Sequence, residues 1–377
     1  MDTLLQELVA IPSVFGEQDA TKRIIDYVDE KLQLLNLHIE YFECGGYPAI
    51  VATTQKTKTP KVMLYAHLDV VAAPQELYKL RMEDGKYYGR GVLDMKSAVA
   101  TYLHILKDIQ YDVSSYDIGL MFTTDEEGSG NFGTGGLVKQ GYIPQVCVMP
   151  DSGFDTNWEI ERSAKGCWFA HVIALGVSAH GSRPWQGDSA SIKLIKALND
   201  IVLLFKDRQK PDTTTINIGM LHGGESINQI PAVSMASLDI RFIDMQDFYR
   251  LKRKIQAICD THGVTLKTIR KWNKPTTNKL DHPLIQTFLR HVTLQTGITP
   301  ASFTAYGASD ARFFLDRGIP CVLMSPPGGS AHSNDEWLSV EGYQQYQLIL
   351  RDYIEEVART PAARSGKVIH RALTTTL

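Results

Sequence analysis

The first third of the chain contains the segment Val62-Met63-Leu64-Tyr65-Ala66-His67-Leu68-Asp69. Its opening residues form a short apolar run, typical of a buried strand, and a histidine and an aspartate follow where that strand would end. At positions i and i+2 of an extended segment, His67 and Asp69 face the same side. Such a pair can supply a metal-binding imidazole and a carboxylate that orients it. The pattern alone is equally compatible with a structural His–Asp pair.

Similar patterns continue on both sides of this segment. Short apolar runs recur at residues 118–122 and 146–149, and helical periodicity is present over residues 19–35 and 95–109. Short strands that alternate with helices predict a mostly parallel sheet covered by helices.

A different order begins near residue 166. It predicts strands and helices in the sequence β-α-β-β-α-β, at residues 167–175, 189–205, 213–221, 233–242, 247–262 and 264–272. This order is typical of a ferredoxin-like α+β domain. The α/β pattern then resumes with a helix at 283–297, an apolar run at 321–324 and a helix at 340–357. We therefore expect an α/β domain of residues 1–165 and 278–377, interrupted by an inserted domain of residues 166–277.

Further candidate ligands lie near the ends of these predicted elements. Asp94 directly precedes the helix at 95–109, a place where aspartate is also a common N-cap. Glu126 and Glu127 follow the run at 118–122, and Asp151 follows the run at 146–149. Acidic turn residues are common at such places. His332 lies in a segment rich in proline and glycine.

Each candidate alone has an ordinary explanation as a turn or cap residue. Their shared location after predicted strands is harder to explain in that way, because ligands of open α/β sheets bind outside the carboxyl ends of the strands. Two histidines and three carboxylates would suit two zinc ions that share one carboxylate. One glutamate would remain to act as a base.

Composition limits the partners and the compartment. The formal charge of the 377-residue chain is −3, so no basic surface for nucleic acid is expected. No apolar run approaches the ~18 residues of a membrane helix, and the first ten residues are unlike a secretory signal. The five cysteines are odd in number and far apart, which indicates reduced thiols. We expect a cytoplasmic protein, with residues 359–377 as a poorly ordered tail or extension.

Three motifs together resemble one enzyme family. They are Ala66-His67-Leu68-Asp69-Val70-Val71, the run from Gly89 to Lys96, and the run from Thr124 to Gly128. The chain is similar, over residues 3–358, to the co-catalytic metallopeptidase/aminoacylase family that includes acetylornithine deacetylase, succinyl-diaminopimelate desuccinylase and carboxypeptidase G. The resemblance implies a zinc-peptidase-like α/β catalytic domain with a mostly parallel mixed sheet. It also implies that the inserted ferredoxin-like domain is a lid through which two subunits form a homodimer.

The resemblance further implies a pair of zinc ions held by five side chains: His67, Asp94, Glu127, Asp151 and His332. His67 and Asp151 would hold one ion, Glu127 and His332 the other, and Asp94 would bridge them. Carboxylate-rich sites also accept Co²⁺ or Mn²⁺.

The same resemblance assigns roles to residues around the metals. Asp69 would hold the His67 ring, and Glu126 would be the general base. His180, on the lid, would reach the active site of the partner subunit; the alternative is a histidine in a surface turn. The peptide bond between Asp94 and Met95 is expected to be cis.

Substrate contacts are implied for Asn228, Arg241 and Ser309, the last together with Asp310. An arginine is the natural receptor for a substrate carboxylate, although Arg241 could instead form an ion pair at a strand edge. Two features depart from the desuccinylase pattern. Ala164 stands where those enzymes have an arginine, and Ala308 stands before Ser309 where they have threonine.

These observations predict a metal-dependent hydrolase that cleaves the amide bond of a small N-acyl amino acid with a free carboxylate. A dipeptidase or a glutamate-type carboxypeptidase of the same family is the alternative. Asp151 is usually glutamate in the deacetylase and desuccinylase branches, whereas the dipeptidase and aminoacylase branches favour aspartate. A metal-free, catalytically inactive binding protein is an alternative of another class. The complete set of candidate ligands argues against it.

Overall fold

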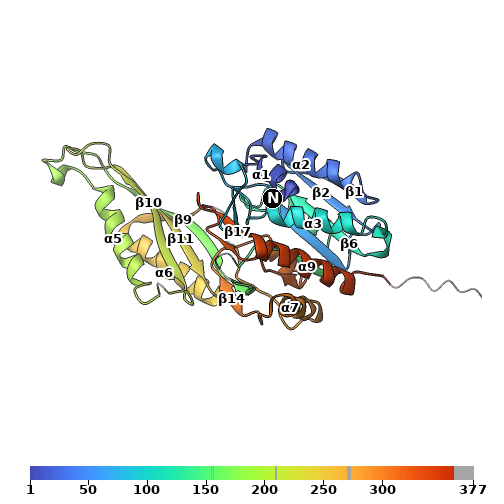
Figure 1. Cartoon of the computed structure of the whole chain (residues 1–377). Helices are drawn as coiled ribbons and strands as arrows, with labels where there is room; N and C mark the ends of the chain where they lie inside the picture. Colours follow the sequence, from blue (N-terminus) through green and yellow to red (C-terminus); the bar gives the residue numbers. More distant parts are fainter. Residues whose placement is uncertain (154, 156, 209, 270–272, 361–377) are drawn as a thin grey trace, which may run out of the picture.

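The computed structural model describes residues 1–153, 155, 157–208, 210–269 and 273–360. An α/β catalytic domain lies on one side of the molecule, and an elongated lid of strands and two helices extends from it (Figure 1). Among the described residues, no helix is long and apolar enough to cross a membrane.

The catalytic domain is built on a six-stranded sheet of order β1-β2-β6-β3-β7-β15. Four of these strands are parallel: β6 (Ile118–Thr123), β3 (Val62–His67), β7 (Val146–Val148) and β15 (Cys321–Val322). An antiparallel hairpin of β1 (His38–Cys44) and β2 (Tyr47–Thr53) completes the edge. Every residue of β3 and β6 is buried, which explains why both strands appear in the sequence as uninterrupted apolar runs.

Helices cover this sheet and form one core with it. They are α1 (Thr3–Val9), α2 (Gln18–Leu32), α3 (Lys96–Asp108), α4 (Thr134–Lys139), α7 (Pro283–Thr296), α8 (Ala311–Leu315) and α9 (Val340–Val357). The buried residues Val99, Tyr102, Leu103 and Leu106 recur at helical spacing in α3, which packs against β3. α9 lies between α3 and α7 and has the predicted bounds.

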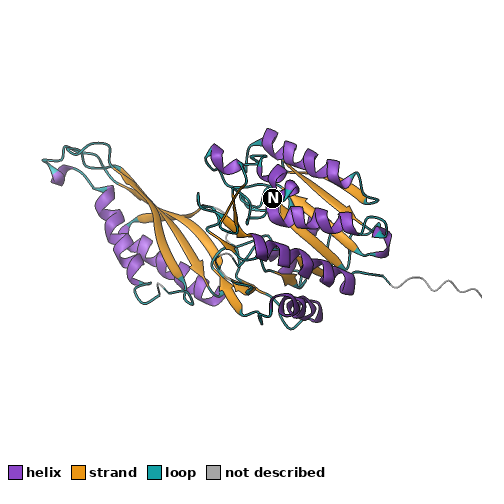
Figure 2. Ribbon diagram, viewed as in Figure 1, coloured by secondary structure: helices purple, strands orange, loops and turns teal. Residues whose placement is uncertain are grey.

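The lid has the predicted β-α-β-β-α-β order. Its strands are β9 (Gly166–Leu175), β10 (Thr215–Gly223), β11 (Val233–Phe242) and β12 (Val264–Thr268), in the antiparallel order β10-β11-β9-β12. Two helices, α5 (Ala190–Leu203) and α6 (Met245–His262), pack against this sheet (Figure 2). They share a second hydrophobic core with it, so the ferredoxin-like prediction is confirmed.

Two small sheets lie outside the main sheets of the catalytic domain and the lid. In one, β8 (Ile160–Ala164) pairs with β13 (Thr276–Thr277) and β14 (Ser302–Ala305), where the chain enters and leaves the lid. These crossing strands and the two separate cores support the proposed boundaries at residues 165/166 and 277/278.

The other small sheet has the order β16-β17-β5-β4, with β4 (Arg81–Glu83), β5 (Lys86–Tyr88), β16 (Gly328–Gly329) and β17 (Trp337–Ser339). It brings the segment before Asp94 beside the segment that contains His332. Of the predicted tail, residues 361–377 lie outside the described part of the chain.

Candidate metal centre

The metal-ligand candidates meet at one edge of the catalytic sheet. β3 ends at His67, opposite Thr123 of β6, and β7 runs parallel to β3 on the other side. Because the strands are parallel, the loops that follow them open on the same edge of the sheet. These loops bring Glu127 and Asp151 close to His67.

Asp94 lies between the two histidines. Its Oδ1 is 2.9 Å from His67 Nε2, and its Oδ2 is 3.1 Å from His332 Nε2. His332 Nε2 also lies 3.2 Å from Glu127 Oε2. One carboxylate that contacts both imidazoles, one through each oxygen, is the arrangement that a bridging ligand requires.

Two groups of potential ligand atoms lie within 4.8 Å of one another. The first is His67, Asp94 and Glu127, and the second is His67, Glu126 and Asp151. Glu126, expected as the base, is therefore as close to His67 and Asp151 as a ligand would be.

Negative charge is concentrated at this buried edge. Burial, and then the charge of Asp151, raise the pKa of Glu126 well above its ordinary value. Burial and the charge of Asp94 do the same to the pKa of Asp151, whose Oδ2 is buried without a hydrogen-bond partner among the described residues. A bound cation would offset this repulsion and give that oxygen a partner. Mixed imidazole and carboxylate donors fit zinc, so the residues present are suited to a metal centre.

The histidines respond to the same charges. Hydrogen bonds to Asp94 and Glu127 raise the pKa of His332 to about 10. Burial is the largest single influence on His67 and opposes its protonation, but the hydrogen bond to Asp94 and the charges of Asp94, Glu126 and Asp69 together raise its pKa well above the ordinary value. Because a metal binds neutral imidazole, metal binding is expected to release protons from these two side chains.

Asp69 is close to His67, but its contacts differ from the prediction. The His67 Nδ1 atom lies 2.9 Å from the main-chain carbonyl of Asp69 and 3.7 Å from its carboxylate. That carboxylate instead accepts hydrogen bonds from the main-chain N–H groups of Glu126 (3.4 Å) and Glu127 (2.9 Å). In this arrangement the carbonyl of Asp69 is closer to the ring than its carboxylate is, and the carboxylate holds the 126–127 turn. The role of Asp69 in catalysis stays a prediction.

The lid residues His180 and Asn228 are adjacent to each other but do not join the metal-ligand cluster of their own chain. The N–H of Gly181 donates to the carbonyl of Asn228 at 2.7 Å, and the exposed His180 ring accepts from Ser182. They belong to the loops after β9 and β10, at the end of the lid farthest from the catalytic domain (Figure 1).

Arg241 and Ser309 lie where the lid joins the catalytic domain. Arg241 forms two hydrogen bonds to Asp239, at 2.7 and 3.1 Å, so the ion pair considered as its alternative is present. It also lines a cavity of about 430 Å³ together with Lys165 and Tyr306. Ser309 caps the turn before α8, accepting from the N–H of Ala311 at 3.3 Å.

Asp310 has a different environment from its neighbour Ser309. It is fully buried, and its Oδ2 accepts hydrogen bonds from the hydroxyls of Tyr65 (2.8 Å) and Thr134 (2.5 Å). These contacts join the start of α8 to the central sheet. A contact between Asp310 and the substrate stays a prediction.

One buried residue near the centre was missed in the sequence. Glu336 accepts hydrogen bonds from the main-chain N–H groups of Gly91, Leu93 and Asp94, in the turn that ends at Asp94. It follows Asp335 in an acidic loop, and no periodicity distinguishes the two carboxylates.

The predicted cis peptide bond between Asp94 and Met95 is present.

A mostly parallel sheet with imidazoles and carboxylates at its carboxyl edge, carrying an inserted ferredoxin-like lid, defines a hydrolase of the metallopeptidase type. The chain belongs to Peptidase family M20/M25/M40, whose model matches residues 63–356. Members of this family are metal-dependent peptidases and amidohydrolases, and the chain is an enzyme of this class.

Relatives cover nearly the whole chain. Succinyl-diaminopimelate desuccinylase of Hydrogenovibrio crunogenus is 27% identical over 371 residues, with 93% of this chain and 96% of the relative covered. Aminoacylase-1 of Sus scrofa is 27% identical over 405 residues, with 96% of each chain covered. A tripeptidase from Staphylococcus aureus has a similar fold, with a TM-score of 0.80, 21% identity, and 95% of this chain and 97% of that one covered.

Proposed function

We propose that this enzyme uses two zinc ions to cleave the amide bond of a small N-acyl amino acid that bears a free carboxylate. The observation that carries the proposal is the Asp94 carboxylate between His67 and His332. Relatives named desuccinylase and aminoacylase support an N-acyl substrate.

In this proposal, His67 and Asp151 would hold one ion, Glu127 and His332 would hold the other, and Asp94 would be a ligand shared by both. Two such ions would supply Lewis-acid polarisation of the scissile carbonyl and of water. The donor set would also accept Co²⁺ or Mn²⁺.

Glu126 is the residue best suited to move protons. It lies with His67 and Asp151 at the buried edge, where burial and the neighbouring charge raise its pKa well above the ordinary value. A general base is most effective when its pKa lies near the working pH. Glu126 would take a proton from water and deliver it to the leaving amine.

Substrate binding is proposed for three other residues. Arg241 would bind the substrate carboxylate after giving up its ion pair with Asp239. Asn228 and Ser309 would make further contacts with the substrate.

The lid is proposed to form a homodimer that brings His180 to the partner's metal centre. Its edge strand β10 exposes Met220 and Leu221, and α5 exposes Ile192, Ile195 and Leu203, each by more than half of its surface. Unpaired apolar edges and exposed apolar patches commonly mark interfaces. A two-fold axis would place each lid loop at the other subunit's site by symmetry.

A hydrolysis screen tests the substrate class. N-acetyl and N-succinyl amino acids are compared with dipeptides at equal concentration, with the zinc content of the protein measured in parallel. Faster turnover of dipeptides would replace the proposal by the dipeptidase alternative, and a protein that binds no metal would support the inactive binding protein.

All five cysteines are buried and free of disulfides, which supports a reducing, cytoplasmic location.

A further inference from the structure

A single buried carboxylate collects four hydrogen bonds beside the candidate metal centre. Glu336 is 2% exposed. Its Oε2 accepts from Arg90 Nη1 at 2.6 Å and from the N–H of Gly91 at 3.0 Å. Its Oε1 accepts from the N–H groups of Leu93 at 3.0 Å and Asp94 at 3.2 Å. Each oxygen therefore has two donors, and every donor comes from the turn that ends at Asp94.

The turn that Glu336 holds is closely packed. Gly91 has a φ of +82°, and a Cβ there would lie 3.0 Å from side-chain atoms of Val70 and Lys96. Three main-chain N–H groups of this turn converge on one anion, as in the concave backbone sites that bind anions. Without the carboxylate, these buried N–H groups would lose their hydrogen-bond partners, which destabilises this conformation of the turn.

The same residue connects this turn to the second histidine. Glu336 directly precedes β17, which pairs with β5 next to the turn. Arg90 Nη2 donates to the carbonyl of Ser333 at 3.0 Å, one residue after His332. The Glu336–Arg90 pair thus joins the segment of Asp94 to the segment of His332, whose side chains lie 3.1 Å apart.

We propose that Glu336 is a positioning residue that holds Asp94 and His332 at the separation needed for metal binding. Its hydrogen bonds go to Arg90 and to main-chain N–H groups, so it acts through the main chain of Asp94 and through Arg90. The inference rests on the proposed metal centre but not on the identity of the substrate.

The experiment compares zinc affinity in the variant Glu336→Gln and in the wild type. Glutamine replaces one carboxylate oxygen by an NH₂ group that faces two donors, so two of the four hydrogen bonds are lost. Loss of such an outer partner commonly lowers metal affinity 10–100-fold. We therefore expect the Kd for Zn²⁺, measured by competition with a chromogenic chelator, to rise by about that factor. Excess Zn²⁺ should restore kcat without a change in KM.

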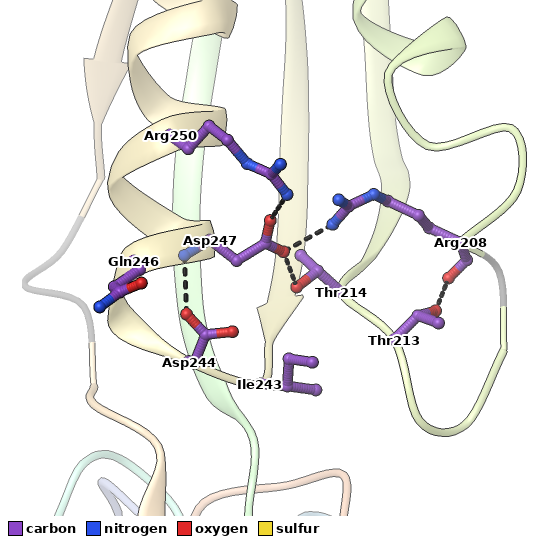
Figure 3. Close-up of a pocket in the computed structure, with 8 residues that line it drawn as sticks. All are labelled: Arg208, Thr213, Thr214, Ile243, Asp244, Gln246, Asp247 and Arg250. Atoms are coloured by element: carbon purple, nitrogen blue, oxygen red, sulfur yellow. Dashed lines mark hydrogen bonds and ion pairs between the residues drawn. The ribbon is translucent and has the colours of Figure 1, made fainter.

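Asp247→Asn provides a matched control in the lid. Asp247 is also a buried carboxylate held by arginines: it accepts from Arg208 and Arg250 and from the hydroxyl of Thr214, in a hollow of about 550 Å³ (Figure 3). This variant should lower the free energy of unfolding and leave the Kd for Zn²⁺ unchanged. If both variants weaken zinc binding equally, Glu336 has only a general structural role and the proposal is overturned.

A second variant covers the case in which Glu336→Gln does not fold. Arg90→Lys retains the positive charge beside Glu336 but cannot also reach the carbonyl of Ser333. Its Kd for Zn²⁺ should rise several-fold, and an unchanged Kd in a folded Arg90→Lys protein overturns the proposal. Failure of this proposal can be told apart from failure of the proposed substrate class. If the wild type binds Zn²⁺ but cleaves no N-acyl amino acid, the difference in the Kd for Zn²⁺ between each variant and the wild type is still expected.

Discussion

The carboxyl edge of the catalytic sheet and the outer end of the lid contribute to the proposed site in different ways. At the sheet edge, Asp94 already lies within hydrogen-bonding distance of both His67 and His332. At the lid end, the segment of His180 is joined to Asn228 through the N–H of Gly181, and neither residue belongs to the groups of potential metal ligands found among the described residues. The first region is assembled by the parallel topology of one chain. For the second region, we propose that a partner subunit brings His180 to the metal centre.

The largest effect should come from the sheet edge, in the variant Glu126→Gln. If Glu126 transfers protons, hydrolysis should fall by ~10²–10⁴-fold while metal binding is retained. Glu127→Ala is the control, because Glu127 is proposed as a ligand and its loss should remove metal as well. Steady-state kinetics and metal analysis of both purified variants make the comparison. Loss of metal from Glu126→Gln would show that Glu126 is a ligand, as its place in the second group of potential ligand atoms also allows.

The lid end should give the next largest effect. His180→Ala should lower kcat by ~10²–10³-fold if His180 stabilises the oxyanion of the transition state. The zinc content should stay at the wild-type level, because within the described part of the chain the His180 ring bonds to Ser182 and not to a candidate metal ligand.

Subunit mixing determines in which chain His180 acts. In a heterodimer of His180→Ala and Glu126→Gln, action across the interface leaves one site without both groups and one site intact. Activity should then recover towards about half of the wild-type value. If the subunits exchange but activity does not recover, or if the protein is a monomer at working concentration, then His180 does not act in the partner's site.

Much of the fold was predictable because its elements are regular and buried on one face. The periodicity located α9 and β11 at their observed bounds, and the element order identified the ferredoxin-like lid. The β1–β2 hairpin was missed because β1 is mostly exposed and shows no apolar run. The small sheets were missed because their strands have two to five residues, too few for a periodic pattern.

The candidate site was predictable to a similar extent. Residues that follow buried strands, such as His67 and Asp151, were identified because the strand places them. The contacts of Asp69 and Glu336 depend on which main-chain N–H groups face each carboxylate, and a sequence does not contain that geometry. Both residues act on the backbone of a neighbouring loop, where no side-chain pattern is required.

Asp69→Asn should have an intermediate effect, again at the sheet edge. Asparagine can accept from only one of the two N–H groups of Glu126 and Glu127 that the carboxylate now holds. We expect a fall of ~10–100-fold in activity or metal affinity, as for other outer partners of metal ligands. The His67 ring should stay in place, because the Asp69 carbonyl holds it. A crystal structure of the variant with a rotated His67 ring would support the role that the sequence suggested for the side chain.

The smallest effect concerns Glu161, in the strand β8 through which the chain passes from the catalytic domain to the lid. Burial raises the pKa of Glu161 from 4.5 to about 7. Since the folded pKa lies above the unfolded one, its contribution to stability is fully present below pH 4.5 and is lost as the pH rises through about 7. Such a shift corresponds to about 3 kcal/mol at most. Glu161→Gln cannot ionise, so its free energy of unfolding relative to the wild type should increase between pH 4.5 and pH 8, as measured by urea denaturation. A constant difference across that range would mean that the buried Glu161 carboxyl does not change its charge, and that the junction between the two regions is insensitive to pH.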